Sequence, residues 1–199
     1  MLLACDPGYN NYGCSVIDQY GTVIDVGTIQ TTKTKNKLNR VADDDVRRIT
    51  YITEQLSRVI RHYDVKGVLS ELPPSGGQSA IAVKGLAMAV ALSTALFTSF
   101  SLPIEWATPA EVKKAIAGKE NASKEDIMLA VCKKYGWKIT EKPVYSKTTK
   151  KVQRIDKTYH PIGKSIGKNL FEHIADSLGA FEALKHTNTA RMFLKKQTA

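Results

Sequence analysis

Four residues of this sequence have the types and positions that metal-assisted chemistry uses. Asp6 and Glu71 each follow a short apolar run, where a buried strand would end. His173 and Asp176 are three residues apart in an amphipathic segment, so both would project from one side of a helix. Carboxylate oxygens with one imidazole suit Mg²⁺ or Mn²⁺, and two such ions could hold the attacking water and the leaving oxygen of a phosphodiester. Together these residues predict a metal site for phosphodiester cleavage.

Each of these residues, taken alone, also fits an ordinary structural role. Asp6 could cap the tight turn that Asp6-Pro7-Gly8 predicts, and Glu71 could be a solvated strand end. His173 and Asp176 could form a surface pair near a helix N-terminus. The metal-site hypothesis therefore depends on the four residues meeting in space, which the elements between them must bring about.

The hydrophobic pattern predicts those elements. Apolar alternation and runs predict strands, apolar residues at helical spacing predict helices, and Ser123 with Asp126 forms a helix-capping pattern. The predicted order is strands 2–5, 12–17 and 22–29, helix 43–63, strand 65–69, helix 79–100, strand 103–107, helices 108–116 and 123–135, and a last helix over 170–186. This order indicates an α/β fold, a mixed sheet with helices on its faces. The ends of its strands would bring Asp6 and Glu71 to one crevice.

Composition narrows the class of protein. The chain has 199 residues, of which 43% are hydrophobic, so we expect one domain over 1–199 with a well-formed core. Three cysteines without metal-ligand spacing favour a reducing compartment, and the first residues lack a signal peptide, so we expect a cytoplasmic protein. Ser and Thr interrupt the apolar stretch 85–102, which predicts a buried helix and no membrane span. Cys5 and Cys14, as well as Met88, Met128 and Phe171, are expected in the core.

The positive charge is concentrated in one segment. The net charge is +10, and residues 133–168 hold 11 Lys or Arg against two acidic residues. Tyr135, Trp137, Tyr145 and Tyr159 are interleaved with these basic residues. Cations that bind phosphates, with aromatic rings that stack on bases, are typical of nucleic-acid-binding surfaces. A solvated surface loop is the alternative interpretation of this segment.

Several motifs together resemble the RuvC-type Holliday junction resolvases, within the RNase H-like superfamily. The resemblance rests on the Asp6-Pro7-Gly8 opening, the strand-end Glu71 and the His173-x-x-Asp176 pair, which occur in the family's order. Residues 107–118 and 122–127 are similar to the family's helix–loop–helix, and residues 173–180 to its closing helix. The similarity covers most of the chain. It implies a five-stranded mixed sheet, with an antiparallel meander of three strands plus two parallel strands, flanked by helices.

The resemblance also implies an activity. Such a protein would be a homodimeric, metal-dependent endonuclease that nicks two strands of like polarity across a four-way DNA junction, leaving 5′-phosphate and 3′-hydroxyl ends. Asp6, Glu71 and Asp176 would bind Mg²⁺ or Mn²⁺, with two ions per site. His173 would be a further ligand or a base that orients water. The residues implied to support catalysis or contact phosphate are Lys113 and Lys124.

The sequence departs from the family in two places. Bacterial members carry an aromatic residue shortly after the central Glu, whereas residues 72–78 contain none. Residues 136–168 are also longer than in compact members, and we expect a DNA-binding extension here, a β-hairpin formed by residues 140–152 and 155–162. Its predicted DNA contacts are Lys138, Lys147, Lys150, Lys151, Arg154, Lys157, Lys164 and Lys168, in addition to Lys113 and Lys124. Such a divergent, compact form resembles phage-encoded versions.

Three other functions remain open at this point. The same site could cut flaps, other branched DNA, or RNA in a hybrid, because such proteins read shape and backbone more than bases. A non-catalytic nucleic-acid-binding module would use only the basic segment. Actin-like and sugar-kinase ATPases also begin with a strand, Asp and Gly, but they need two such domains, for which this chain is too short.

Overall fold

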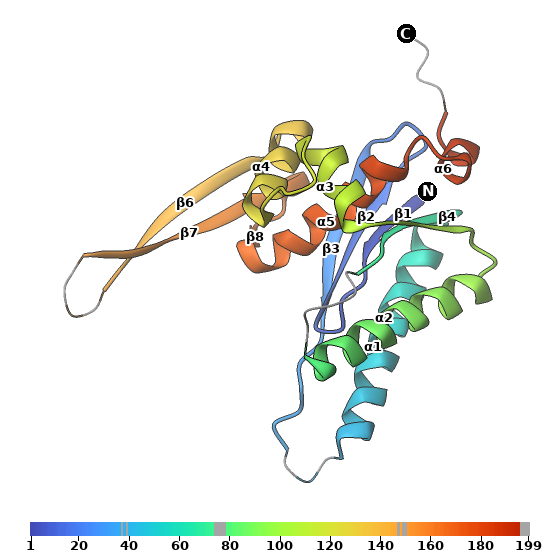
Figure 1. Cartoon of the computed structure of the whole chain (residues 1–199), viewed down its shortest axis with the longest axis horizontal. Coiled ribbons are helices and arrows are strands. Elements are labelled where there is room, and N and C mark those ends of the chain that lie inside the picture. The colour runs from blue at the N-terminus through green and yellow to red at the C-terminus, as the bar shows by residue number, and fades with distance from the viewer. Residues whose placement is uncertain (37, 39, 74–78, 147, 149–150, 196–199) are drawn as a thin grey trace.

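A five-stranded mixed sheet forms the centre of the molecule (Figure 1). The structure is a computed structural model that describes residues 1–36, 38, 40–73, 79–146, 148 and 151–195. The strands, in chain order, are β1 (Leu2–Asp6), β2 (Asn11–Ile17), β3 (Val23–Gln30), β4 (Gly67–Glu71) and β5 (Ile104–Ala107). They lie side by side in the order β3-β2-β1-β4-β5. The first three are antiparallel and the last two run parallel to β1, so the mixed sheet expected from the sequence is confirmed.

Helices cover both faces of this sheet, because its central strands are apolar on both sides. In β1, Leu2 and Ala4 belong to one buried cluster, while Leu3 and Cys5 belong to the other. Helices α1 (Val41–His62) and α2 (Ala80–Ser99) cover the second cluster. The helices that cover the first are α3 (Pro109–Ala117), α4 (Lys124–Tyr135), α5 (Lys168–Leu184) and α6 (Asn188–Phe193).

The helices on the α3–α5 face begin where the sequence supplies caps. Thr108 and Glu111 form a capping box at the start of α3, and Ser123 and Asp126 form another at the start of α4.

Two predictions for the C-terminal helices differ from the structure. The last helix was predicted over 170–186, whereas α5 begins at Lys168 and ends at Leu184, two residues earlier at each end. Helix α6 was missed, since only six residues form it.

A second, three-stranded sheet projects from this core as a long hairpin (Figure 1). Its strands are β6 (Lys138–Tyr145), β7 (Val152–His160) and β8 (Ile166–Gly167). A short 3-10 helix, Pro161–Gly163, follows β7, and α5 follows β8. A hairpin was expected, but with the wrong bounds: Val152 opens the second strand, and the left-handed backbone of Ile162, with φ +47°, lies beyond it. At the base of the hairpin, Tyr159 stacks on Phe171 of α5, with ring centres 4.2 Å apart.

Helix α2 is less buried than the sequence suggested. One side, including Gly85, Ala89 and Phe97, packs inward, but Ile81 is 85% exposed. By length and composition α2 is the one helix among the described residues that could cross a membrane, a test that core helices also pass. The buried-helix prediction is therefore wrong for the outer side of α2. The core prediction is wrong for Met88, which is partly exposed on α2.

The other core predictions hold. Met128 and Phe171 are fully buried. Cys5 and Cys14 are buried thiols that face each other across β1 and β2. The segment after Glu71 lies largely outside the described residues, which resume at residue 79.

Candidate active site

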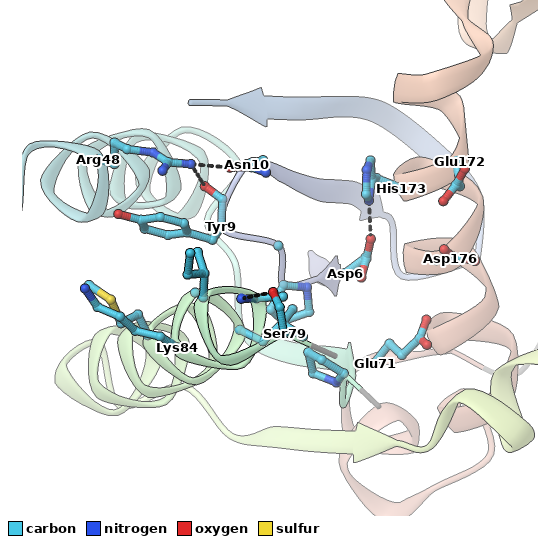
Figure 2. Close-up of a pocket in the computed structure, with 18 of the residues that line it drawn as sticks. Asp6, Tyr9, Asn10, Arg48, Glu71, Ser79, Lys84, Glu172, His173 and Asp176 are labelled. Atoms are coloured by element: carbon cyan, nitrogen blue, oxygen red, sulfur yellow. Dashed lines mark hydrogen bonds and ion pairs between the residues drawn. The ribbon is translucent and has the colours of Figure 1, made fainter. Parts of the chain in front are cut away.

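The carboxyl ends of β1 and β4 meet the first turns of α5 at one edge of the central sheet (Figure 2). A pocket of about 750 Å³ opens there. Its walls include all six residues that were predicted to do chemistry: Asp6, Glu71, Lys113, Lys124, His173 and Asp176. The crevice at parallel strand ends, expected from the fold class, is thus where these distant parts of the sequence meet.

Two glycines allow α5 to carry its side chains into this pocket. A Cβ added at Gly13 of β2 would lie 2.1 Å from the carbonyl oxygen of His173, a distance that real side chains do not adopt. A Cβ added at Gly179 would lie 2.5 Å from Cγ1 of Val112 on α3. Helix α5 therefore approaches β2 on one side and α3 on the other, which brings Lys113 to the same pocket.

Asp6 and His173 form a direct pair in the pocket. Nδ1 of His173 lies 2.7 Å from Oδ2 of Asp6, and both side chains are partly buried. Burial alone would lower the pKa of His173, but the hydrogen bond to Asp6 and the negative charge of that carboxylate raise it above its usual value. With Nδ1 engaged in this way, Nε2 is the ring nitrogen left for another partner.

Glu71 and Asp176 lie in an environment that opposes their ionisation. Burial, followed by the charges of Asp176 and Asp6, raises the pKa of Glu71 to about 9. Burial, followed by the charges of Asp6 and Glu172, also raises the pKa of Asp176. One buried oxygen of Glu71, Oε2, has no hydrogen-bond partner among the described residues. Neither carboxyl group forms an ion pair with a residue that the structure describes, so no direct contact with a cation offsets its burial.

Lysines stand at the rim of this acidic pocket. The positive charges of Lys113 and Lys124 lower the pKa of Glu71, but less than burial and its acidic neighbours raise it. Lys124 forms an ion pair with Glu172, and the hydrogen bond to Glu172, with the charge of that carboxylate, raises the pKa of Lys124 although burial lowers it. Glu172 also lines the pocket, and sequence reasoning missed it although it precedes His173.

The residues present suit a divalent cation, although they do not form a closed ligand sphere. Among the described residues, no three His, Cys, Asp or Glu side chains lie close enough together to form a ready-made metal site. Figure 2 shows Asp6, Glu71 and Asp176 around one space, with Asp6 turned to His173. The orphaned Oε2 and the raised pKa of Glu71 are what a site for positive charge would show without its ion.

Comparison with known proteins identifies the family. The family model for "Crossover junction endodeoxyribonuclease RuvC" matches residues 2–148 of this chain. The chain belongs to the RuvC family. The matched residues include Asp6, Glu71, Lys113 and Lys124, whereas His173 and Asp176 lie beyond them and are brought to the pocket by the fold.

Two RuvC relatives and two solved RuvC structures are among the proteins similar to the chain. The crossover junction endodeoxyribonuclease RuvC of Cytophaga hutchinsonii is 29% identical over 137 residues, 67% of this chain and 64% of that protein. The RuvC of Salinibacter ruber is 30% identical over 131 residues, 64% of this chain and 68% of that protein. The alignment thus spans just under two thirds of the first relative's length.

The RuvC structure of Thermus thermophilus has the same fold. The two structures superpose with a TM-score of 0.60 over 96% of this chain and 95% of the T. thermophilus chain, at 19% sequence identity. The same T. thermophilus protein in complex with Holliday junction substrate gives a TM-score of 0.59 over 89% and 90%, at 18% identity. The RNase H-like, five-stranded mixed sheet expected from the sequence is therefore confirmed.

A buried arginine that sequence reasoning missed holds the loop after Asp6 in this RuvC fold. Arg48 of α1 is 5% exposed and donates hydrogen bonds to the carbonyl of Tyr9, at 3.1 Å, to Oγ1 of Thr31, at 2.9 Å, and to the side chain of Asn10. Its guanidinium lies 3.7 Å from the centre of the Tyr9 ring (Figure 2). The loop that follows Asp6 is thereby tied to α1. The sequence does contain a signal for this role: Arg48 lies four residues before Ile52 and continues the buried apolar stripe that Ile52, Leu56 and Ile60 form on α1.

The residues predicted to contact DNA separate into groups. Lys113 and Lys124 line the pocket, and Lys147 and Lys150 lie outside the described residues. Lys138, Lys151 and Arg154 are exposed on the hairpin, where Arg154 pairs with Asp156. The remaining three are bound to acidic side chains at the hairpin base: Lys157 and Lys168 to Glu125, and Lys164 to Asp25. Those pairs join the hairpin base to α4 and β3.

Proposed function

We propose that this chain is a metal-dependent endonuclease that resolves four-way DNA junctions by paired nicks in strands of like polarity, leaving 5′-phosphate and 3′-hydroxyl ends. The observation that carries the proposal is the meeting of Asp6, Glu71, His173 and Asp176 in one pocket with lysines at its rim. Membership of the RuvC family and the names of its relatives support the same activity. The T. thermophilus protein in complex with Holliday junction substrate supports the choice of substrate.

Asp6, Glu71 and Asp176 would hold Mg²⁺ or Mn²⁺ in this pocket, with two ions per site. Three carboxylates suit hard cations, and the unpartnered Oε2 of Glu71 is available as a ligand. When bound, the ions supply Lewis-acid activation of the phosphate and of the attacking water. Binding of the cations would also favour the ionised forms of Glu71 and Asp176.

The other pocket residues would position the reacting groups. The hydrogen bond between His173 Nδ1 and the carboxylate of Asp6, which accepts it, fixes the His173 ring and leaves Nε2 directed away from Asp6, where it can accept a proton from water or act as a ligand. Lys113 and Lys124 would face the scissile phosphate and stabilise its developing negative charge. A His173→Asp variant that keeps its activity would favour the ligand role over the base role.

The chain would act as a homodimer in the cytoplasm. Paired nicks need two sites, and the exposed apolar side of α2, including Ile81 and Val83, is available for a second copy. Two buried, facing thiols, Cys5 and Cys14, fit a reducing compartment.

The test is a cleavage assay with Mg²⁺ or Mn²⁺ on a labelled immobile four-way junction, a flap, a Y-fork and a linear duplex. We expect the wild type to make paired, symmetric nicks in the junction, and Asp6→Asn to bind the junction without cutting it. Cleavage of every branched substrate would replace the junction-specific proposal with a general branched-DNA nuclease. Equal binding by both proteins without any cleavage would indicate a binding module.

A further inference from the structure

The outer half of the β6–β7 hairpin is a two-stranded ribbon without a covering layer. Strand β8 pairs only with Thr158 and Tyr159, near the base of the hairpin. Beyond that point, β6 and β7 pair with each other from Glu141–Lys157 to Tyr145–Val152. A two-stranded ribbon of this kind has no further layer of its own to cover its faces. Side chains on this part of the hairpin are therefore presented outward.

The two faces of this ribbon carry different side chains. Pro143 lies opposite Ile155, and Tyr145 lies opposite Val152 after a shift in register that follows Val144. These four apolar residues therefore share one face, although Val152 and Ile155 are three residues apart. Tyr145, Val152 and Ile155 are 56%, 53% and 55% exposed. The opposite face at the same level carries Lys142, Val144, Arg154 and Asp156. We call the side that carries these exposed apolar residues the apolar face.

The charge of the hairpin indicates what the apolar face binds. Residues 138–160 contain seven basic and two acidic residues. Lys138, Lys142 and Lys151 form no ion pair with any residue that the structure describes. Two copies of such a hairpin would repel each other, whereas a polyanion would be attracted. An exposed aromatic ring beside unpaired cations is the combination that holds single-stranded or unstacked nucleic acid.

We propose that the apolar face of the hairpin contacts unstacked bases at the branch point of DNA, an inference that rests on the proposed function. The ring of Tyr145 stacks on an exposed base, and Val152 and Ile155 pack beside it. Lys142, on the opposite face, and Lys151 contact the phosphates of the adjoining strands. Because stacking is largely indifferent to base identity, this contact selects branched over fully paired DNA rather than a sequence.

The experiment compares substitutions on the two faces of the ribbon, in the Asp6→Asn background so that the DNA stays intact. Tyr145→Thr and Ile155→Thr remove apolar surface but keep strand propensity, and Val144→Thr is the matched control on the opposite face. Each protein is titrated onto an immobile four-way junction with 2-aminopurine at the branch point, and onto a linear duplex of equal length. Thermal unfolding and sedimentation velocity are measured in parallel, and Tyr145→Phe tests for rescue by a ring.

We expect Tyr145→Thr and Ile155→Thr to weaken junction binding about tenfold and to reduce the fluorescence increase of 2-aminopurine. Duplex affinity should stay within about twofold, and Val144→Thr and Tyr145→Phe should behave as the parent protein. An equal loss on junction and duplex, or no loss on either, would overturn the inference. A change in sedimentation with unchanged fluorescence would identify a second copy as the occupant. If the parent protein itself does not prefer the junction, the proposed function fails instead.

Discussion

The hydroxyl of Ser15 in β2 donates a hydrogen bond to the hydroxyl of Ser177 in α5; the two Oγ atoms are 2.8 Å apart, and both residues are fully buried. The direction follows because Ser177 itself donates to the carbonyl of Ile174. This bond joins the central sheet to α5 at Ser177, the residue that follows Asp176. Ser15 is two residues from Gly13, where a Cβ would collide with the carbonyl of His173, so this contact helps to place the side chains of α5.

Replacing Gly13 by alanine should displace α5 and disturb the site. The added methyl group would overlap the His173 carbonyl, and overpacking of this kind costs about 1–3 kcal/mol. We expect Gly13→Ala to lower Tm by about 5 °C and to reduce junction cleavage at least about tenfold. Differential scanning calorimetry and the cleavage assay measure the two effects. Gly27→Ala in β3 is the matched control, since a Cβ there meets nothing within 4 Å; a similar loss in both variants would refute the steric explanation.

Arg48 should be needed for the geometry of the loop after Asp6. Arg48→Met keeps much of the volume but removes the hydrogen bonds that Arg48 donates to Thr31 Oγ1 and to the Tyr9 carbonyl, which then keeps only the hydrogen bond from the Thr31 hydroxyl. We expect a cost of about 1–3 kcal/mol. We expect lower stability in urea and slower cleavage, with junction affinity unchanged. Arg58→Met, on an exposed side of the same helix, should leave stability and activity as they are. Equal effects of the two substitutions would contradict a role for the Arg48 network.

The stability of the metal-free protein should fall as pH rises from about 5 to 9. Glu71, with its pKa raised to about 9, keeps its proton in the folded state at pH values where the unfolded chain releases it. Its stabilising contribution is therefore complete below about pH 4.5 and lost as pH approaches 9. The raised pKa values of Asp176 and His173 act in the same direction. We expect a fall in Tm of about 5 °C across this range in EDTA.

Adding Mg²⁺ should remove most of this pH dependence, because a bound cation stabilises the ionised carboxylates. Glu71→Gln should flatten the profile in EDTA, whereas the exposed Glu120→Gln should not. Scanning fluorimetry from pH 5 to 9, with and without Mg²⁺, provides the measurement. If the Tm of the wild type in EDTA does not change with pH, the pKa values of the pocket carboxyl groups are not raised in the folded protein.

Local patterns in the sequence predicted the elements of the fold, whereas the directions of the five strands were expected from the family resemblance, and both are confirmed. Apolar periodicity, and the Ser123–Asp126 capping pattern at the start of α4, located the five central strands and helices α3 and α4 within a few residues, since these signals are local. The order β3-β2-β1-β4-β5 depends on packing between distant segments. The outer side of α2 was predicted wrongly, because an Ala-rich helix has no polar side from which its exposure can be read.

The same division applies to the site. Asp6, Glu71, His173 and Asp176 were found by residue type and position, and the fold brings them to one pocket. Arg48 and Gly13 were missed because their importance arises from contacts with residues far along the chain: Arg48 with the loop after Asp6, and Gly13 with α5. Local patterns cannot show such contacts, although a lone charge on an apolar stripe, as at Arg48, is a signal that can be sought.

Two neighbouring lysines of α3 allow a test of the phosphate-facing role. Lys113 lines the pocket, whereas the adjacent Lys114 is exposed and pairs with Glu120. Removing a positive charge that faces the reacting phosphate typically slows cleavage about 100-fold. We expect Lys113→Gln to show a loss of this order in single-turnover rate, with little change in junction affinity, and Lys114→Gln to be close to wild type. Equal rates for both variants would exclude Lys113 from the chemistry.

The exposed cations of the hairpin should determine how binding responds to salt. Each phosphate contact made by a lysine contributes about 0.9 to the slope of log affinity against log salt concentration. Lys138, Lys142 and Lys151 form no ion pair within the described part of the chain, so all three are available to DNA. We expect the triple change to Gln to reduce the slope by about two to three, measured by fluorescence anisotropy on an uncleaved junction between 50 and 300 mM NaCl.

The control for this experiment replaces three lysines outside the hairpin, Lys66, Lys114 and Lys119, which pair with Asp64, Glu120 and Asp126. It should leave the slope within about 0.5 of wild type. Equal slopes for the two triple variants would mean that the charge of the hairpin, though concentrated there, does not contact the DNA.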